Sequence, residues 1–144
     1  MAVNTDQLVR EVIQLAPIIK QQFVRPVDAC VSGKIPPNQM SILNILSKHD
    51  SQTMVQLSKQ ILVCRQQMTQ LIDEMVKKGL IARAANENDR RSVCIALTDY
   101  GRTRLDELNA ELVLELRQVF EAYTDEQKAS LMANAREIRR IVSR

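Results

Sequence analysis

One segment in the middle of the sequence, CRQQMTQLIDEMVKKG (64–79), constrains the fold more than any other. Its apolar residues recur at intervals of three and four positions: Met68, Leu71, Ile72, Met75 and Val76. This spacing places them on one face of an α-helix, so that face is predicted to be buried. Lys77 and Lys78 suit the negative end of the helix dipole, and Gly79 suits the cap of a helix C-terminus. The segment is therefore predicted to be a helix with one buried face and a polar outer face.

Three helices are predicted before this one. The first runs to about Cys30 with a kink expected at Pro17, and its apolar residues again recur at helical spacing: Leu8, Val12, Leu15, Ile19 and Phe23. The second covers residues 38–49, where two alternative sets of residues could form the buried face: Met40, Leu43 and Leu46, or Ile42 and Ile45. The third is a short helix over residues 54–61, which the capping-box pair Thr53 and Gln56 opens.

A β-hairpin is predicted directly after the central helix. Residues 80–86 and 92–98 are predicted to be two strands, and in the second of them Val93, Ile95 and Leu97 alternate with smaller residues. The polar turn ENDRR (87–91) separates the two runs. Two short strand-like runs on either side of a polar turn are typical of a β-hairpin. Arg90 and Arg91 would then lie at the tip of this hairpin.

Two further helices are predicted to complete the chain. Thr98 is placed to cap a long helix from Asp99 to about Ala122. Thr124 and Gln127 form another capping-box pair, which opens a helix that runs to the C-terminus.

The composition agrees with a mostly helical protein. A chain of 144 residues is about the size of one domain and can bury a core without disulfides or a metal. Three glycines and four prolines are few, and good helix formers are common. We therefore predict a single domain, residues 1–144, which is mostly α-helical with a small β-hairpin.

Positive charge is concentrated in the middle of the chain. Between Lys59 and Arg104 there are nine basic residues and five acidic ones. From Asp106 to Glu126 there are seven acidic residues and a single arginine. This asymmetry is the one expected if only the middle of the chain meets a polyanion.

The predicted elements follow the order of a winged helix-turn-helix: helix, tight turn, helix with a polar outer face, and hairpin with a cationic tip. An exposed glutamine on such a helix can donate and accept at once, and so can pair with the edge of adenine in the major groove. Arginines at a hairpin tip can reach the neighbouring minor groove, whose negative potential attracts them. The order of elements therefore favours binding to double-stranded DNA.

The chain resembles the MarR-type transcriptional regulators. The resemblance covers nearly the whole chain and is most specific from Thr53 to Leu105, where the motifs VKKGLIAR, DRR and ALTDYGR follow one another at the spacing of that family. It implies a winged helix-turn-helix part at residues 36–98. It also implies a homodimer, formed by helices within residues 5–31 and 99–144, that binds a roughly palindromic operator.

The resemblance also implies the residues that contact DNA. Those expected in the major groove are Arg65, Gln66, Gln67, Thr69 and Gln70. Arg91 is expected in the minor groove beside Arg90, with its side chain held by an ion pair to Asp89. The chain departs from the family at three positions, with Leu62 in place of the usual glycine of the turn, Cys64 in place of a capping serine, and Pro36 in place of a capping threonine.

Several functions follow as hypotheses. The first is a repressor that a small molecule releases from its operator, since relatives often respond to phenolic or other aromatic acids. The second is a redox-sensing regulator, because a thiol at a helix N-terminus beside a cation, as at Cys64, favours the reactive thiolate. Cys30 and Cys94 are expected to pack in the interior. A third is a winged fold used for protein contact, which predicts fewer cations on the helix face and hairpin tip. Binding of single-stranded RNA would need more exposed aromatic rings than this chain offers.

Other classes of site find no support in the sequence. His49 is the only histidine, and it and the cysteines lack the spacing of metal ligands. No Gly-rich phosphate loop or nucleophile motif is present, so neither a cofactor nor an enzyme is predicted. The N-terminus lacks the pattern of a signal peptide, no apolar run approaches membrane-spanning length, and the cysteine count is odd. The expected location is the cytoplasm.

Overall fold

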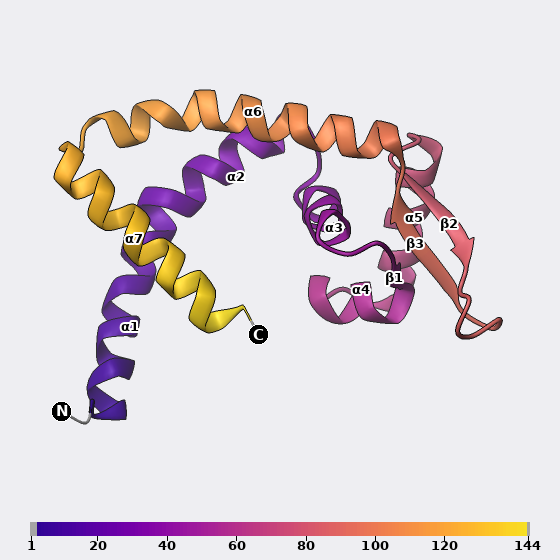
Figure 1. The fold of residues 1–144 in the computed structure, drawn as a ribbon, viewed down its shortest axis with the longest axis horizontal. Coiled ribbons are helices and arrows are strands. Elements are labelled where there is room, and N and C mark those ends of the chain that lie inside the picture. The colour runs from indigo at the N-terminus through magenta and orange to yellow at the C-terminus, as the bar shows by residue number, and fades with distance from the viewer. Residues whose placement is uncertain (1–2, 144) are drawn as a thin grey trace. The chain divides into compact units, whose positions relative to one another are not determined.

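The computed structural model describes residues 3–143 and is mostly helical with one small antiparallel sheet (Figure 1). The predicted fold class, a winged helix-turn-helix with flanking helices, is confirmed. Two compact units make up the chain, Met1–Leu112 and Val113–Arg144. The first contains the sheet and the helix-turn-helix. The second contains the end of α6 and the whole of α7.

The predicted first helix is divided into three parts. These are the α-helix α1 (Thr5–Ile19), the π-helical turn η1 (Lys20–Val24) and the α-helix α2 (Arg25–Ser32). Pro17 lies within α1, so the departure from α-helical geometry comes one turn after the residue at which a kink was expected. At η1 the N–H of Arg25 bonds to the carbonyl of Lys20, five residues earlier. The wider turn precedes Pro26, which has no N–H to continue an α-helical ladder.

Helix α3 (Pro37–Ser47) forms the centre of the first unit. Both faces proposed for it from the sequence contribute to the interior, because α2, α4, α5 and a strand all contact it. Met40, Ile42, Leu43 and Leu46 are buried, and Ile45 is half-buried. A helix surrounded on several sides shows no clear apolar stripe, which is why its sequence left the alternatives open.

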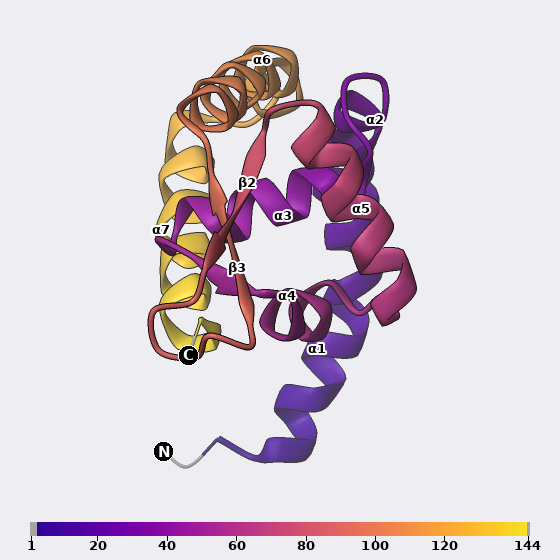
Figure 2. The same cartoon turned by 90° about the vertical axis from the view of Figure 1, so that its right-hand side faces the viewer.

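Helices α4 (Met54–Ile61) and α5 (Arg65–Lys77) follow, joined by a short turn (Figure 2). The predicted capping box opens α4: Thr53 Oγ1 accepts from the N–H of Gln56 at 3.2 Å, and Gln56 Oε1 accepts from the N–H of Thr53 at 2.8 Å. The predicted stop of α5 is also confirmed. Gly79 has a φ of +73°, and the N–H of Leu80 bonds to the carbonyl of Met75. This is the Schellman arrangement for which glycine is favoured.

The predicted hairpin is formed by β2 (Ile81–Ala85) and β3 (Val93–Leu97), which pair antiparallel with Arg83 opposite Ile95. A third strand, β1 (Gln52–Thr53), pairs with the other side of β3, so the strand order is β1-β3-β2. The sequence did not predict β1. A strand of two residues carries no readable alternation, and its existence depends on a partner more than forty residues away.

One hydrophobic core joins these elements. Its fully buried side chains come from α3, α4, α5, α6 and the sheet: Ile42, Leu43, Leu46, Leu57, Met68, Ile72, Met75, Ile81, Ile95 and Leu108. The apolar stripe predicted for α5 is therefore the face turned toward this core. Gln39 on α3 is the single polar residue fully buried among the described residues.

Helix α6 (Asp99–Glu121) begins directly after β3. Thr98 caps it as predicted, since Thr98 Oγ1 accepts from the N–H of Gly101 at 2.9 Å. The second unit includes helix α7 (Asp125–Val142), and the predicted capping box at Thr124 and Gln127 is present. Over residues 3–143, no helix combines the length and apolar character that crossing a bilayer requires.

Candidate nucleic-acid interface

The turn between α4 and α5 keeps the shape of a tight helix-turn-helix although Leu62 stands in place of a glycine. Leu62 ends α4 in the left-handed region, with φ of 59° and ψ of 41°. Its N–H bonds to the carbonyl of Ser58 at 3.1 Å, and its side chain is 88% exposed. A left-handed leucine is strained because its Cβ crowds the carbonyl oxygen that follows. The turn is therefore formed at some cost in free energy.

Helix α5 begins at this turn with Cys64 as its N-cap residue. Gln67 Oε1 accepts from the N–H of Cys64 at 3.3 Å, which helps to satisfy the first turn of the helix. Cys64 itself is exposed, whereas Cys30 and Cys94 are half-buried. Of the three cysteines, the predicted redox residue is thus the accessible one.

The outer face of α5 presents every residue predicted for the major groove. All five are exposed, namely Arg65, Gln66, Gln67, Thr69 and Gln70, while Met68 between them is fully buried. Two of the five also have a local structural role. Gln67 contacts Cys64, and Thr69 Oγ1 donates to the carbonyl of Arg65 at 3.0 Å. Within the described chain, the side chains of the other three form no hydrogen bond or ion pair with protein.

The hairpin tip is shaped by hydrogen bonds among its own polar residues. Asn86 Nδ2 donates to Ser92 Oγ at 2.7 Å, and Asn86 Oδ1 accepts from the N–H of Asn88 at 3.0 Å. Asp89 Oδ1 accepts from the backbone N–H of Arg91 at 3.0 Å, and the carbonyl of Asp89 accepts from the N–H of Ser92 at 3.1 Å. These bonds close the turn that carries the two arginines.

The expected ion pair between the side chains of Asp89 and Arg91 is not formed among the described residues. The Asp89 carboxylate instead contacts the backbone of Arg91, as Asx turns do, and so it shapes the turn. Arg90 and Arg91 are both exposed, and within residues 3–143 neither guanidinium lies in an ion pair. Their charge is therefore available to a partner outside the chain.

An ion pair that the sequence did not reveal joins the hairpin to α5. Arg83 on β2 contacts the carboxylate of Asp73 on α5, and both side chains are about half-exposed. Exposed pairs of this kind contribute little to stability. The contact nevertheless neutralises Arg83, so this arginine differs from those at the hairpin tip.

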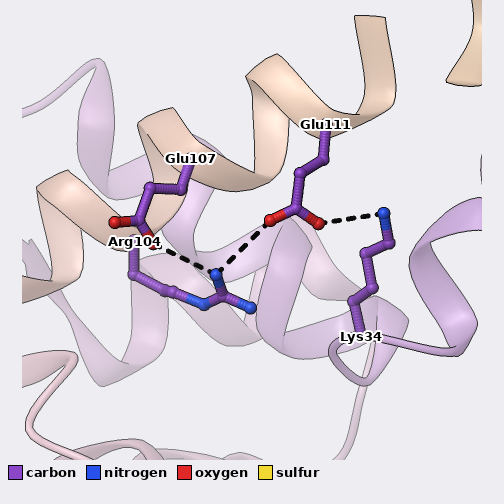
Figure 3. Close-up of polar contacts among 4 residues, drawn as sticks. All are labelled: Lys34, Arg104, Glu107 and Glu111. Atoms are coloured by element: carbon purple, nitrogen blue, oxygen red, sulfur yellow. Dashed lines mark hydrogen bonds and ion pairs between the residues drawn. The ribbon is translucent and has the colours of Figure 1, made fainter. Parts of the chain in front are cut away.

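A second ion-pair cluster lies between α6 and the connection from α2 to α3 (Figure 3). Lys34 Nζ lies 2.9 Å from Glu111 Oε2, and Arg104 Nη1 lies 3.1 Å from Glu107 Oε2 and 3.8 Å from Glu111 Oε1. Two cations of the first unit are thus paired with the acidic residues of α6. Within residues 3–143, Arg65 at the start of α5 and Arg90 and Arg91 at the hairpin tip are exposed and lie in no ion pair. The cationic middle predicted from the sequence therefore presents free positive charge at these two places.

The described residues contain no group of three or more His, Cys, Asp or Glu side chains arranged to hold a metal ion. The helix face bears arginine, glutamine and threonine side chains, and the hairpin tip bears Arg90 and Arg91 beside the carboxylates of Glu87 and Asp89. Arginine, glutamine and threonine side chains suit contact with phosphates and base edges.

Comparison with known proteins agrees with this geometry. The model of the MarR family matches residues 35–93. The chain is 30% identical over 109 residues to the HTH-type transcriptional repressor MdtR of Bacillus subtilis, covering 74% of this chain and 70% of that protein. It is 34% identical over 110 residues to the HTH-type transcriptional regulator YsmB of the same organism, covering 74% of this chain and 75% of that one.

Solved structures share the fold. A MarR family protein from Bacillus stearothermophilus superposes with a TM-score of 0.77 at 24% identity, covering 99% of this chain and all of that one. A mutant of Escherichia coli MarR complexed with operator DNA gives a TM-score of 0.63 at 21% identity, covering 94% and 99% of the two chains. The family match, the named relatives and the winged helix-turn-helix together show that this chain is a transcriptional regulator of the MarR family.

Proposed function

We propose that the protein is a homodimeric repressor that binds a pseudo-palindromic operator duplex in a sequence-specific manner and is released by a small-molecule effector. The observation that carries the DNA-binding part of this proposal is the exposure of unpaired donors on two elements of one domain. Arg65, Gln66 and Gln70 project from α5, and Arg90 and Arg91 project from the hairpin tip. Side chains with a purely structural role would be expected to form ion pairs or hydrogen bonds within the protein.

In this proposal α5 lies in the major groove. Gln66 and Gln70 are four residues apart and so lie on the same helix face. Each free amide could pair with the N6 and N7 edge of an adenine, and Arg65 could pair with a guanine. Thr69 and Gln67 would contribute secondary contacts, because part of their hydrogen-bonding capacity serves the helix itself.

The hairpin tip would contact the neighbouring minor groove or its phosphates. Arg91 is the residue proposed to enter the groove, with Arg90 beside it. Asp89 would contribute by shaping the turn rather than by pairing with the guanidinium. An arginine at this position is expected to bind most strongly where the groove is narrow, since a narrow groove concentrates negative potential.

The homodimer is proposed to form through residues 5–31 and 99–144. No residue of α1 is buried, although this helix exposes a series of large apolar side chains: Leu8, Val9, Val12, Ile13, Leu15, Ile18 and Ile19. The second unit likewise exposes Met132, Ile138, Ile141 and Val142. Apolar surface of this extent usually marks an interface. Two copies of the chain would also match the two half-sites of a palindrome.

The oligomeric state can be measured directly. We expect light scattering after size exclusion to give a mass of about twice 16.4 kDa. Charged substitutions on the apolar faces, Val12→Glu and Ile138→Glu, should reduce this mass. Gln14→Glu, on the polar side of α1 with Arg10, is the matched control and should not. A monomer for the unsubstituted protein would contradict the proposed dimer.

The effector is proposed to be a small aromatic or phenolic acid, which rests on the family resemblance alone. To release the operator it must bind the protein more tightly in a form that fits DNA poorly. The ratio of its affinities for the two forms of the protein limits how far it can shift the equilibrium from the DNA-binding form to the other. A second candidate mode of regulation is oxidation of Cys64, which the exposure of this thiol at the start of α5 favours.

Base contacts can be tested by substitution in α5. We expect Gln66→Ala and Gln70→Ala each to weaken operator binding by about tenfold, the discrimination of one bidentate base contact. Gln118→Ala, at an exposed position of α6, is the matched control and should leave the affinity unchanged. Fluorescence anisotropy on a duplex selected from genomic fragments measures the affinity of each of the three variants. Equal affinities for all variants would exclude α5 from the interface.

A further inference from the structure

The most unusual polar contact in the first unit joins α3 to the end of α5. Gln39 on α3 is fully buried, at 0% exposure. Its Nε2 donates to Glu74 Oε2 at 3.0 Å, and its Oε1 accepts from Lys78 Nζ at 3.0 Å. The nitrogen and the oxygen of this one amide therefore each bond to a different residue at the end of α5. The outer face of this helix bears the proposed DNA contacts.

These three residues form what we call the Gln39 clamp. Glu74 and Lys78 are exposed, and they lie on the last turn of α5 and just after it. They are four residues apart and so share one face of the helix. An amide that donates to a carboxylate and accepts from an ammonium makes two charge-assisted hydrogen bonds in opposite directions. The clamp therefore fixes both the rotation of α5 about its axis and its position along that axis.

The apolar contacts of α5 are less directional than the Gln39 clamp. Its fully buried side chains are Met68, Ile72 and Met75. Methionine is flexible and adapts to small shifts of its neighbours. Apolar packing also lacks the directionality of a hydrogen bond. Core burial thus holds α5 in the molecule, while the Gln39 clamp is the contact best suited to set its register.

We infer that Gln39 is a positioning residue for DNA recognition, acting through Glu74 and Lys78 on the base-reading face of α5. This inference rests on the proposed function. Gln66 lies eight residues before Glu74, which is about 12 Å along the helix axis. A small rotation at the clamp moves Gln66 and Gln70 by a similar angle, and bidentate base contacts tolerate little misalignment. Contacts to phosphates depend less on the rotation and axial position of α5. Loss of the clamp should therefore weaken sequence-specific binding more than nonspecific binding.

The first test replaces the amide with an apolar group of similar length. We expect Gln39→Met to weaken binding to the duplex that the wild type enriches from a random pool by about tenfold, the value of one bidentate contact. Binding to a scrambled duplex of the same composition should stay unchanged. Met40→Leu, a substitution at the next buried position of α3, is the matched control and should alter neither affinity.

The second test exchanges the amide and the carboxylate. Gln39→Glu alone places two carboxylates side by side and should weaken specific binding. Adding Glu74→Gln restores a donor opposite the new carboxylate and keeps the total charge, so the double variant should recover most of the wild-type affinity. A general loss of folding would lower both affinities and would not depend on which of the two residues bears the charge. Circular dichroism and urea unfolding define conditions in which every variant is folded.

The outcomes separate the inference from the proposed function. Loss of specific binding alone, with recovery in the exchanged pair, supports the positioning role. Wild-type affinity in Gln39→Met, an equal loss on both duplexes, or no recovery in the double variant would overturn it. A wild type that binds enriched and scrambled duplexes equally would contradict sequence-specific binding itself and remove the inference with it.

Discussion

Gly101 lies directly against the backbone of Leu80, where the end of α5 leads into β2. A Cβ atom added at Gly101 would lie 1.9 Å from the carbonyl oxygen of Leu80 and 2.8 Å from its carbonyl carbon. That carbonyl oxygen also accepts from the N–H of Thr98 at 3.2 Å. The first turn of α6 is thereby seated against the base of the hairpin. No side chain fits between them, because the clash is with backbone atoms.

Gly101→Ala should therefore be strongly destabilising. The backbone of Leu80 would have to move, which disturbs the hydrogen bond to Thr98 and the start of α6. We expect the free energy of unfolding to fall by about 3 kcal/mol or more, as for severe overpacking. Urea unfolding followed by circular dichroism measures this. Gly33→Ala is the matched control, since nothing lies within 4 Å of its added Cβ. A similar stability for both variants would contradict the close contact.

A glycine at position 62 should relieve the strain in the turn between α4 and α5. The most direct comparison is between Leu62→Gly and Leu62→Ala, because both remove the same exposed side chain. We expect the glycine variant to have a free energy of unfolding about 0.5–1 kcal/mol higher, after allowing for the greater freedom of glycine in the unfolded chain. Urea midpoints with matched slopes report the difference. An alanine variant that is equally or more stable would show that the turn is not strained.

Arg91→Ala tests the proposed minor-groove contact. We expect a loss of about tenfold in affinity at an operator whose flanks are rich in A·T pairs, since a narrow groove attracts arginine most strongly. The loss should be smaller at an operator with the same core and G·C-rich flanks. Titrations on both duplexes with the wild type and the variant provide the comparison. Equal losses at both flanks would place Arg91 on the phosphates instead.

Oxidation of Cys64 has a clear signature in the binding assay. If this thiol is a switch, peroxide should lower the operator affinity of the wild type, of Cys30→Ser and of Cys94→Ser, while Cys64→Ser keeps its affinity. Sulfenic acid formation next to Arg65 would alter the start of α5, the helix proposed to contact DNA. Treated and untreated samples of all four proteins are compared by anisotropy. The same loss in Cys64→Ser as in the wild type would exclude the switch.

The helix boundaries could largely be predicted from local signals. Thr53, Thr98 and Thr124 all cap helices in the structure, and Gly79 ends α5, because caps depend on residues only a few positions apart. The apolar stripe of α5 was equally clear. The π-helical turn η1 was not predicted, since the prolines around it indicate a disturbance but not its form or place.

The contacts that could not be predicted from the sequence join residues that lie far apart along the chain. Gln39 and Glu74 are 35 positions apart, and Lys34 pairs with Glu111 on a helix predicted quite separately. Nothing in the sequence near Gln39 distinguishes a buried glutamine from a solvated one. The family resemblance implied a guanidinium partner for the Asp89 carboxylate, which instead accepts from the backbone N–H of Arg91. The choice between these two donors depends on the shape of the turn. Exposure of the residues on α5, by contrast, followed directly from helical geometry.

We propose that a dimer of this protein binds a specific palindrome. The most direct measurement is selection of bound duplexes from fragmented genomic DNA, followed by sequencing and by a salt titration on the most enriched site. We predict a palindrome whose half-sites lie about one helical turn apart, with a large affinity advantage over scrambled DNA that persists as salt rises. Diffuse enrichment, with binding that salt abolishes equally on every duplex, would contradict sequence-specific recognition by α5 and the hairpin tip.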